Sequence, residues 1–304
     1  MATERKQPER LLNESYMTLK DRYKIFKHHI TSTIAIHWHE FFEIAFIYEG
    51  EGLHILNGTT YPLRRGSLFL LSPADFHEVS SLPGQTLKLY NMIFSERFLR
   101  EELYYDAFRQ TANRQYNFSG ALADEIERQF RQIWHEAEEE QEEQFGAAYI
   151  VQGALERVIV ELARGLRKQE QEQEQEHEHV YEYDKPLGSM DRNPKIDEPI
   201  RKSLTFIQHH FREPLTLSDA ARQARLSPNY YSECFHRQLG LSFQSYIQEL
   251  RLEFACALLR ISDLPVTDIC LAAGFNTLSH FERLFKRKYS RSPRQLRKAA
   301  HKLE

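Results

Sequence analysis

Short apolar runs separated by turn residues dominate residues 23–95. Their lengths are those of β-strands, and the clearest runs are 43–48, 53–56, 67–71 and 87–94. Asn57-Gly58, between Leu53–Leu56 and Thr59–Leu63, favours a two-residue hairpin because both turn positions require a positive φ. Many short strands with regular turns predict a β-sandwich or barrel.

The spacing of apolar positions becomes helical from Ser119 onward. One stripe consists of Leu122, Ile126, Phe130 and Ile133, and a second of Ala148, Val151, Leu155, Val158, Ile159, Leu162 and Leu166. This spacing predicts two amphipathic helices that pack as an antiparallel hairpin. The stripes either dock on the barrel or form a dimer seam, and we expect the hairpin to contribute to a dimer.

Residues 168–196 interrupt the apolar pattern. Lys168 to His179 contains no apolar residue, and four Pro or Gly residues follow before position 200. The first piece is compatible with a helix but has nothing to bury, and prolines break the second piece. We therefore predict a barrel with its N-terminal arm (1–118), a helical hairpin (119–167), a linker (168–196) and an all-α domain (197–304), which together make an α+β multidomain chain.

The C-terminal third contains two similar helix-turn-helix patterns, at 217–238 and 266–288. Ser227 is a candidate cap with Pro228 at the first helical position, and Gly274 lets the chain leave a helix before Asn276 or Thr277 caps the next. Ser242 begins a continuous helical stretch, Phe243 to Ile261, about 28 Å long. Such a spacer can set two second helices about one DNA turn apart, roughly 34 Å, so that one chain reads two successive major grooves.

Charge divides the chain in the same place. From Arg201 onward there are 17 Lys and Arg against nine Asp and Glu, which gives a net charge of +8. The first 200 residues have a net charge of −12, and the whole chain has a net charge of −4. A basic third on an acidic body indicates a polyanionic partner, and the alternative is a basic surface without a partner.

Composition excludes several classes of protein. The chain of 304 residues is long enough for about two domains, and no apolar run reaches the length of a membrane span. The polar N-terminus does not read as a secretory signal, and Cys234, Cys256 and Cys270 form no CxxC pair. We expect a cytoplasmic protein without a membrane partner or a disulfide framework.

Residues 200–297 resemble the DNA-binding domain of AraC/XylS-family transcription regulators. In the second pattern the resemblance rests on Ile269, Gly274-Phe275, Phe281, Phe285-Lys286, Ser292-Pro293 and Arg297 at their spacing; in the first it rests on Ser227-Pro228, Tyr230, Phe235, Gly240, Ser242-Phe243, Tyr246 and Arg251. Two positions depart from the family pattern, with Cys270 where Ala is usual and Ser290 where Gly is usual.

The resemblance assigns roles to residues of the two second helices. Base contacts fall to Asn229, Ser232, Glu233, His236, Leu278, Ser279, Glu282 and Arg283. Phosphate contacts, which hold register without reading sequence, fall to Arg237, Lys286, Arg287, Arg291 and Arg294. For each residue the alternative is an ordinary solvated helix face.

Histidines in the barrel region resemble the two motifs of a cupin. His37, His39 and Glu43 precede Gly50 in the first motif, and Gly66, Pro73 and His77 form the second. Histidines at i and i+2 on a strand share a face, so with the carboxylate and a histidine from a facing strand they are a possible divalent-metal site. The Pro73–His77 spacing departs from that of metal cupins, and regulators of this type generally bind a small organic effector in the barrel without a metal.

We therefore expect an effector pocket of His37, His39, Glu43, His77, Trp38 and Tyr90, with no cofactor and no catalytic residue. The hypothesis is a cupin-type sensor of a sugar or related metabolite that controls a dimeric DNA-binding domain. Its partners would be double-stranded operator DNA, the effector, a second copy and, for an activator, RNA polymerase. The rivals are a ligand-independent dimeric regulator and a cupin metalloenzyme.

Overall fold

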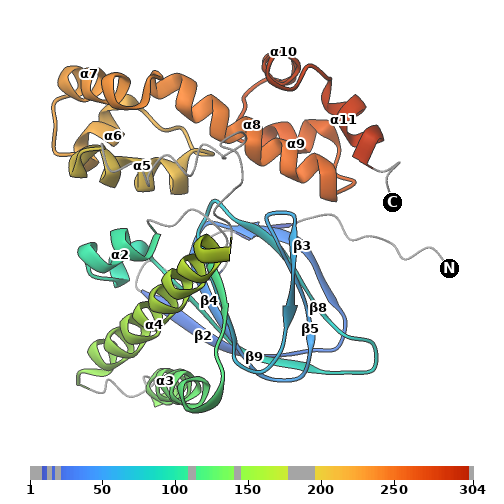
Figure 1. Cartoon of the computed structure of the whole chain (residues 1–304), viewed down its shortest axis with the longest axis vertical. Helices are drawn as coiled ribbons and strands as arrows, with labels where there is room; N and C mark the ends of the chain where they lie inside the picture. Colours follow the sequence, from blue (N-terminus) through green and yellow to red (C-terminus); the bar gives the residue numbers. More distant parts are fainter. Residues whose placement is uncertain are drawn as a thin grey trace. The chain divides into compact units, whose positions relative to one another are not determined.

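The chain folds into two compact units. The computed structural model describes residues 9–11, 16–17, 22–108, 114–139, 145–176 and 196–300. The described residues up to 176 form a β-rich barrel unit and those from 196 a helical unit. Figure 1 shows each unit, and each is considered by itself below.

Two five-stranded sheets form the barrel unit. Their strand orders are β1-β3-β8-β5-β6 and β10-β7-β4-β9-β2. The strands are β1 (Glu9–Leu11), β2 (Tyr23–Ile30), β3 (Thr33–His39), β4 (Phe42–Glu49), β5 (Gly52–Leu56), β6 (Thr59–Leu63), β7 (Ser67–Leu71), β8 (Phe76–Ser81), β9 (Leu87–Phe94) and β10 (Arg114–Asn117). The β5–β6 hairpin turns at Asn57-Gly58, with φ of 51° and 86°, as the sequence predicts.

Strand alternation separates two cores in this unit. Side chains from both sheets, including Ala45, Ile47, Leu56, Phe69 and Val79, fill the space between the sheets. The alternate side chains of the second sheet, such as Ile44 and Phe46, pack instead against helices. Any side chain that shares parity with Ala45 and Ile47 on β4 therefore points into the barrel.

Helices α3 (Gly120–Glu139) and α4 (Ala147–Glu176) cover the outer face of the second sheet, together with α2 (Glu101–Phe108) and the short η1 (Glu96–Phe98). Most residues of both predicted apolar stripes are buried against the second sheet. The stripes therefore dock the helices on the barrel, and the expected dimer seam is not needed to explain them. Leu122 is a correction, because its side chain is 41% exposed and Ala123 takes the buried position. Helix α4 continues to Glu176, so the first part of the predicted linker is helical, and 177–195 lie outside the described residues.

Seven helices form the helical unit as far as the structure describes it. They are α5 (Glu198–His210), α6 (Leu217–Gln223), α7 (Pro228–Leu239), α8 (Phe243–Ile261), α9 (Val266–Ala272), α10 (Leu278–Tyr289) and α11 (Pro293–Ala300). Pro228 occupies the first turn of α7, and the Ser242 side chain accepts from the Ser245 N–H at the start of α8. Within residues 196–300 the side chains of Ser227 and Thr277 make no cap hydrogen bond, which corrects the capping expected for them.

Both second helices of the two patterns end in the left-handed region. Gly240 follows α7 with φ of 70°, and Ser290 follows α10 with φ of 56°. Glycine reaches this region at no steric cost, whereas a side chain there costs about 1–2 kcal/mol. Ser290, which stands where the family usually has Gly, is therefore a site of backbone strain.

A buried ion pair fixes the strand that leads into α3. Arg114 of β10 donates from Nη2 to the Asp75 carboxylate at 2.6 Å and from Nε to the Leu70 carbonyl at 3.2 Å. Asp75 also accepts from Ser72 and Asn57. Burial raises the pKa of Asp75, but Arg114 and these donors outweigh it and hold the pKa below its usual value.

We predict that Ser290→Gly stabilises the helical unit and Gly240→Ser destabilises it, each by up to about 1 kcal/mol, because the two positions share one backbone conformation. Thermal unfolding followed by far-UV circular dichroism measures this. Equal effects of the same sign from both substitutions would contradict the strain at Ser290.

We predict that Arg114→Met lowers the free energy of unfolding of the barrel unit by about 3–5 kcal/mol, since Asp75 would remain as a buried charge without its cation. Arg65→Met is the control, because Arg65 pairs with Asp124 and Glu127 at a half-exposed position where an ion pair contributes under about 1 kcal/mol. Urea unfolding followed by tryptophan fluorescence measures both, since Trp38 and Trp134 lie in this unit. Equal losses of unfolding free energy in Arg114→Met and Arg65→Met would contradict a special role for the buried ion pair.

Candidate functional site

The second helix of each pattern has a buried back. Tyr231, Cys234 and Phe235 of α7 are buried, and the Tyr231 and Ser203 hydroxyls lie 2.9 Å apart. Phe281, Leu284 and Phe285 form the corresponding back of α10. Each helix therefore has one face anchored in the unit and the opposite face free for a ligand.

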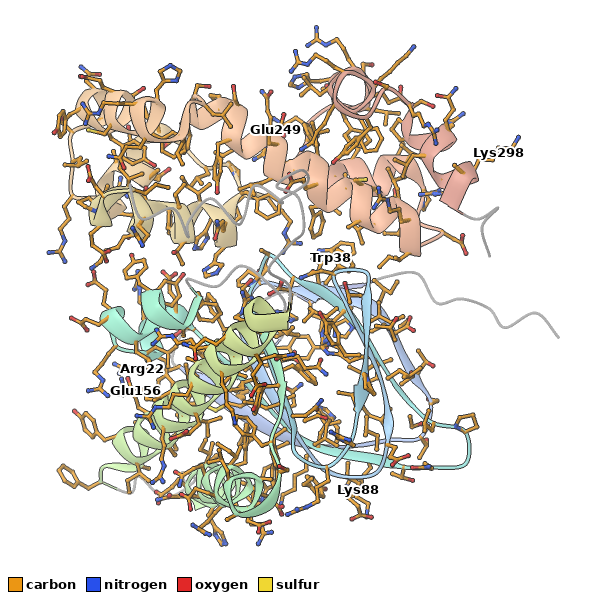
Figure 2. The ribbon with its side chains drawn as sticks, in the orientation of Figure 1. Arg22, Trp38, Lys88, Glu156, Glu249 and Lys298 are labelled. Carbon is orange, nitrogen blue, oxygen red and sulfur yellow. The ribbon has the colours of Figure 1, made fainter. Side chains whose placement is uncertain are left out.

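Most of the residues assigned to DNA are exposed on α7, on α10 or shortly after α10. Asn229, Ser232, Glu233, His236 and Arg237 are exposed on α7. On and after α10, Leu278 and Glu282 are partly buried, and the exposed residues are Ser279, Arg283, Lys286, Arg287, Arg291 and Arg294. The free face of α10 is the more basic one, and nitrogen-tipped side chains project from the outer edge of the unit around it (Figure 2).

Helix α8 holds the two patterns in one body. In the view of Figure 1, α7 and α10 lie along the same edge of the unit, with α8 running between them. Lys288 of α10 pairs with Glu249 and Glu253 of α8. Arg251 of α8 donates to the Phe211 and Glu213 carbonyls beyond α5, and Arg297 of α11 donates to the Leu264 carbonyl beyond α8.

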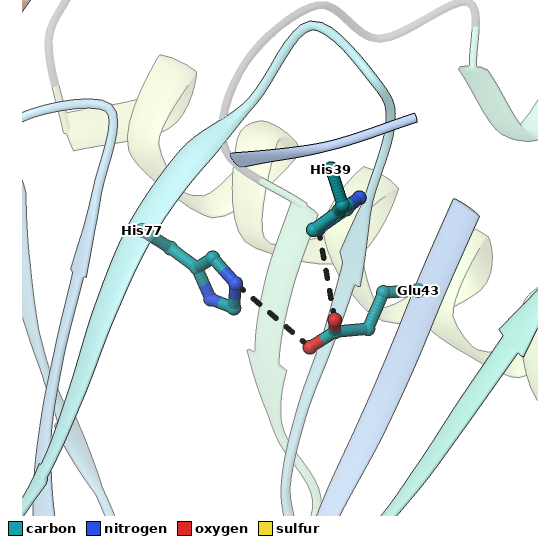
Figure 3. Close-up of side chains that lie close together, drawn as sticks. All are labelled: His39, Glu43 and His77. Atoms are coloured by element: carbon teal, nitrogen blue, oxygen red, sulfur yellow. Dashed lines mark ion pairs between the residues drawn. The ribbon is translucent and has the colours of Figure 1, made fainter. Parts of the chain in front are cut away.

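The barrel unit contains a second site, a buried cluster of His39, Glu43 and His77 from β3, β4 and β8 (Figure 3). Glu43 shares parity with Ala45 and Ile47, so its carboxylate points inward between the two rings. His39 Nε2 lies 3.6 Å from Glu43 Oε2, and His77 Nε2 lies 4.0 Å from Glu43 Oε1. We call these three residues the barrel triad.

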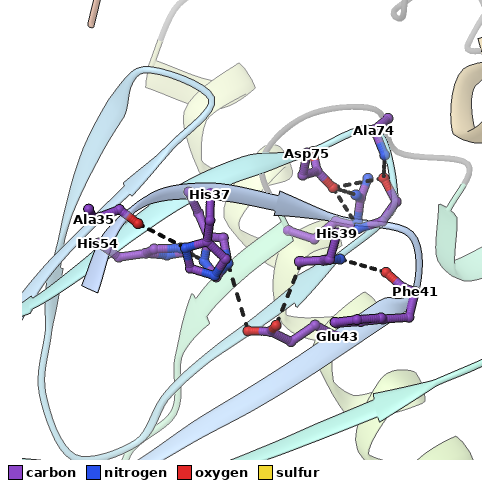
Figure 4. A network of polar contacts seen from close by, with 11 residues as sticks. Ala35, His37, His39, Phe41, Glu43, His54, Ala74 and Asp75 are labelled. Carbon is purple, nitrogen blue, oxygen red and sulfur yellow. Dashed lines mark hydrogen bonds and ion pairs between the residues drawn. The ribbon is translucent and has the colours of Figure 1, made fainter. Parts of the chain in front are cut away.

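Hydrogen bonds behind the barrel triad orient its rings (Figure 4). His39 Nδ1 lies 2.6 Å from the Phe41 carbonyl, and the two rings stack with centroids 4.7 Å apart. His77 Nδ1 lies 3.3 Å from Nε2 of His54, whose Nδ1 lies 2.7 Å from Oε1 of Gln115. His54 belongs to β5 and Gln115 to β10, so this chain of bonds crosses from one sheet to the other.

Burial sets the charge of these groups. It raises the pKa of Glu43 to about 8, against a smaller lowering by the Asn91 side chain. It also lowers the pKa of His54 to about 4, against the opposing effect of the hydrogen bond that His54 donates to Gln115. The pKa of His77 is lowered by burial and by the neighbouring histidines. At neutral pH the interior therefore favours neutral imidazoles and a carboxyl that keeps its proton unless a cation replaces it.

Not every residue predicted for the pocket reaches the barrel triad. His37 is the cross-strand partner of His77, with ring centroids 4.2 Å apart, and it lies beside the triad. Trp38 occupies the opposite parity on β3. Tyr90 belongs to the core between sheet and helices, where it stacks on Phe130, so its place in the predicted pocket is wrong.

His54 and Gln115 join the site without having been predicted for it. The available signal for His54 was its position two residues before Leu56 on a predicted strand, which gives both the same face. Gln115 had no comparable signal. β10 is short, and it pairs with β7, which lies more than 40 residues earlier in the sequence.

The donor set of the barrel triad fits a divalent metal. Imidazole nitrogen and carboxylate oxygen are ligands of first-row ions, and the three donor atoms lie within 4.8 Å of one another. Such an ion would take His39, Glu43 and His77 as ligands, with His54 and Gln115 behind them. None of the described helices is both long enough and apolar enough to cross a membrane.

Comparison with known proteins identifies both units. Residues 20–155 match the family model described as an AraC-like ligand binding domain, and residues 220–299 match a helix-turn-helix domain model. Together these ranges span more than two thirds of the chain.

Two relatives align with most of this chain and with most of their own length. The HTH-type transcriptional activator RhaR of Salmonella schwarzengrund is 25% identical over 282 residues, which cover 92% of this chain and 91% of the relative. The HTH-type transcriptional activator RhaS of Escherichia coli is 27% identical over 263 residues, 86% of each chain.

A solved structure, the C-terminal domain of AraT, a response regulator from Geobacillus stearothermophilus, is 32% identical, with a TM-score of 0.33 and coverage of 34% of this chain and 88% of that one. The two family matches, on the units that carry the exposed α7 and α10 faces and the buried barrel cluster, identify the chain as a DNA-binding transcription regulator of the AraC family with an AraC-like ligand binding domain.

Proposed function

We propose that the protein is a transcriptional activator whose affinity for operator DNA changes when a small polar metabolite, a sugar or related compound, binds in the barrel. The observation that supports this most is the pair of exposed faces on α7 and α10, each backed by a buried apolar stripe and both held by α8. The relatives named above are activators, which favours activation over repression.

Each face would enter a major groove, which admits one α-helix. The 19 residues of α8 span about 28 Å, near the roughly 34 Å of one DNA turn. Arg283 would bond a guanine edge in the second groove, and the exposed cations after it would contact phosphates.

The ligand would act through elements attached to the barrel triad. β1 pairs in parallel with β3, where Leu11 is opposite His39, so the described segment Glu9–Leu11 adjoins the strand that carries His37 and His39. Gln115 lies on β10, which leads through Phe118 into α3. A ligand shifts DNA affinity only if it binds more tightly to one arrangement of these elements than to another.

A second copy and RNA polymerase are the proposed protein partners, and the proposed compartment is the cytoplasm. Phe145 and Tyr149 at the start of α4 are 104% and 78% exposed, and Ile150 beside them is 40% exposed. These side chains extend away from the stripe that packs on the sheet, and they are the apolar surface we assign to the dimer.

Two other functions make different predictions. A ligand-independent regulator would use the barrel only as a dimer scaffold, and none of a broad metabolite panel would stabilise it. A cupin metalloenzyme would turn over a substrate at a stoichiometric metal, with turnover lost in His37→Ala and His77→Ala. We propose regulation without catalysis, because the relatives with matching domains are transcription activators.

We predict that Arg283→Ala relaxes base preference at one operator position and weakens binding there by about 1–3 kcal/mol, because a bidentate guanine contact is lost. Lys286→Ala is the matched variant three residues along the same helix. It should weaken all sequences alike and reduce the slope of log affinity against log salt by about 1. Selection from random duplexes, followed by titrations at several salt concentrations, measures both; identical preferences and slopes would refute the assigned roles.

We predict that a sugar found by a melting screen of pentoses, hexoses and their acids stabilises the full chain by about 2.7 kcal/mol at a hundredfold excess over its Kd. His77→Gln should lose this shift, and His29→Gln, on the exposed part of β2, should keep it. The same sugar should displace the operator titration of the unchanged chain. Overlaying titrations would show that the barrel does not control DNA binding.

A further inference from the structure

We propose that the barrel triad binds one divalent first-row transition-metal ion through His39 Nε2, the Glu43 carboxylate and His77 Nε2. The inference deepens the proposed ligand-binding function of the same barrel. It is tested with metal alone, so its failure and the failure of DNA regulation are distinguishable.

The donor atoms lie close enough together to surround a single ion after a small adjustment. Metal–ligand bonds of about 2.0–2.2 Å place two ligand atoms roughly 3–4 Å apart at tetrahedral or octahedral angles. The distance from His39 Nε2 to Glu43 Oε2, 3.6 Å, falls in that range. His77 Nε2 lies 4.0 Å from the other carboxylate oxygen, and all three donor atoms lie within 4.8 Å of one another, so a bound ion would draw His77 slightly closer. The ligands come from β3, β4 and β8 in both sheets, which hold them in place without a loop.

The hydrogen bond at His39 aims a lone pair at this point. The Phe41 carbonyl can only accept, so Nδ1 of His39 carries the hydrogen in the 2.6 Å bond. In a neutral ring the remaining nitrogen, Nε2, then carries the lone pair, and it lies 3.6 Å from Glu43 Oε2. A carbonyl behind a ligating histidine is the usual arrangement at metal sites.

His77 receives the same orientation through two further side chains. The oxygen of Gln115 accepts from His54 Nδ1, which leaves His54 Nε2 to accept from His77 Nδ1. His77 Nε2 is then the bare nitrogen; it is buried and has no hydrogen-bond partner among the described residues. Two independent hydrogen-bond paths therefore present two lone pairs to one carboxylate.

The chemistry of the set decides the class of ion. Two imidazoles and a carboxylate suit Zn²⁺, Co²⁺, Mn²⁺, Fe²⁺ or Ni²⁺ better than Ca²⁺, which takes six to eight oxygens. Three protein ligands leave at least one coordination position, open to water or an oxygen of a ligand. His37 donates from Nδ1 to the Ala35 carbonyl beside the triad, and we assign it no ligand role.

The test is a titration of the untagged full chain, freed of metal with a chelator, with Zn²⁺ and separately with Co²⁺. Calorimetry and the visible Co²⁺ spectrum should give one saturable site per chain. Glu43→Gln and His77→Gln should each weaken it at least a hundredfold. His29→Gln should leave it unchanged, and so should substitution of His177 and His179 in the glutamate-rich segment.

Gln115 tests the positioning path without touching a ligand. Gln115→Leu removes the acceptor behind His54 and should weaken metal binding about 10–100-fold. Gln115→Glu keeps an acceptor oxygen and should restore most of the affinity, which a purely structural role would not predict. Near-ultraviolet circular dichroism of each variant reports whether the barrel is folded.

Two results would overturn the proposal. One is no saturable binding of either ion to the folded chain; the other is binding that persists unchanged in both Glu43→Gln and His77→Gln. Operator binding measured on the same preparations decides separately whether the chain is a regulator.

Discussion

The packing of α7 and α10 around a single continuous helix is the constraint on which DNA recognition depends. Burying Tyr231 and Phe235 on one side, and Phe281 and Phe285 on the other, fixes which face of each helix remains in solvent. Lys288 and its two carboxylate partners also link α10 to α8, so the two faces belong to one packed unit. Specificity is thus a property of the whole unit as well as of the side chains that touch bases.

In the barrel the corresponding constraint is the two-residue period of the strand. It sends Ile44 and Phe46 to the helices while Glu43, Ala45 and Ile47 face inward, so a carboxylate is placed in an apolar interior. A charge there is costly unless it is paired, which is why the raised pKa of Glu43 and the two facing imidazoles belong to one site. The same period gives β4 one face that packs against the helices and one face that carries Glu43 into the barrel.

Local patterns in the sequence predicted much of this architecture, and contacts between distant segments account for what it missed. Asn57-Gly58, Pro228 and Gly274 predicted the turns and helix starts because their backbone preferences act within a few residues. Tyr90 was misplaced because either face of β9 is apolar enough to be interior. Gln115 could not be predicted, since its partner lies 61 residues away across the barrel.

The bond between His54 and Gln115 spans two sheets that share no backbone hydrogen bond through these strands. In the proposed regulator, His54 and Gln115 would therefore connect His77 to β10, the strand that leads into α3. A reorientation of the His54 ring along this hydrogen-bond path would need no change in strand pairing. Communication in the proposed regulator would then depend on which nitrogen of each buried imidazole carries the proton.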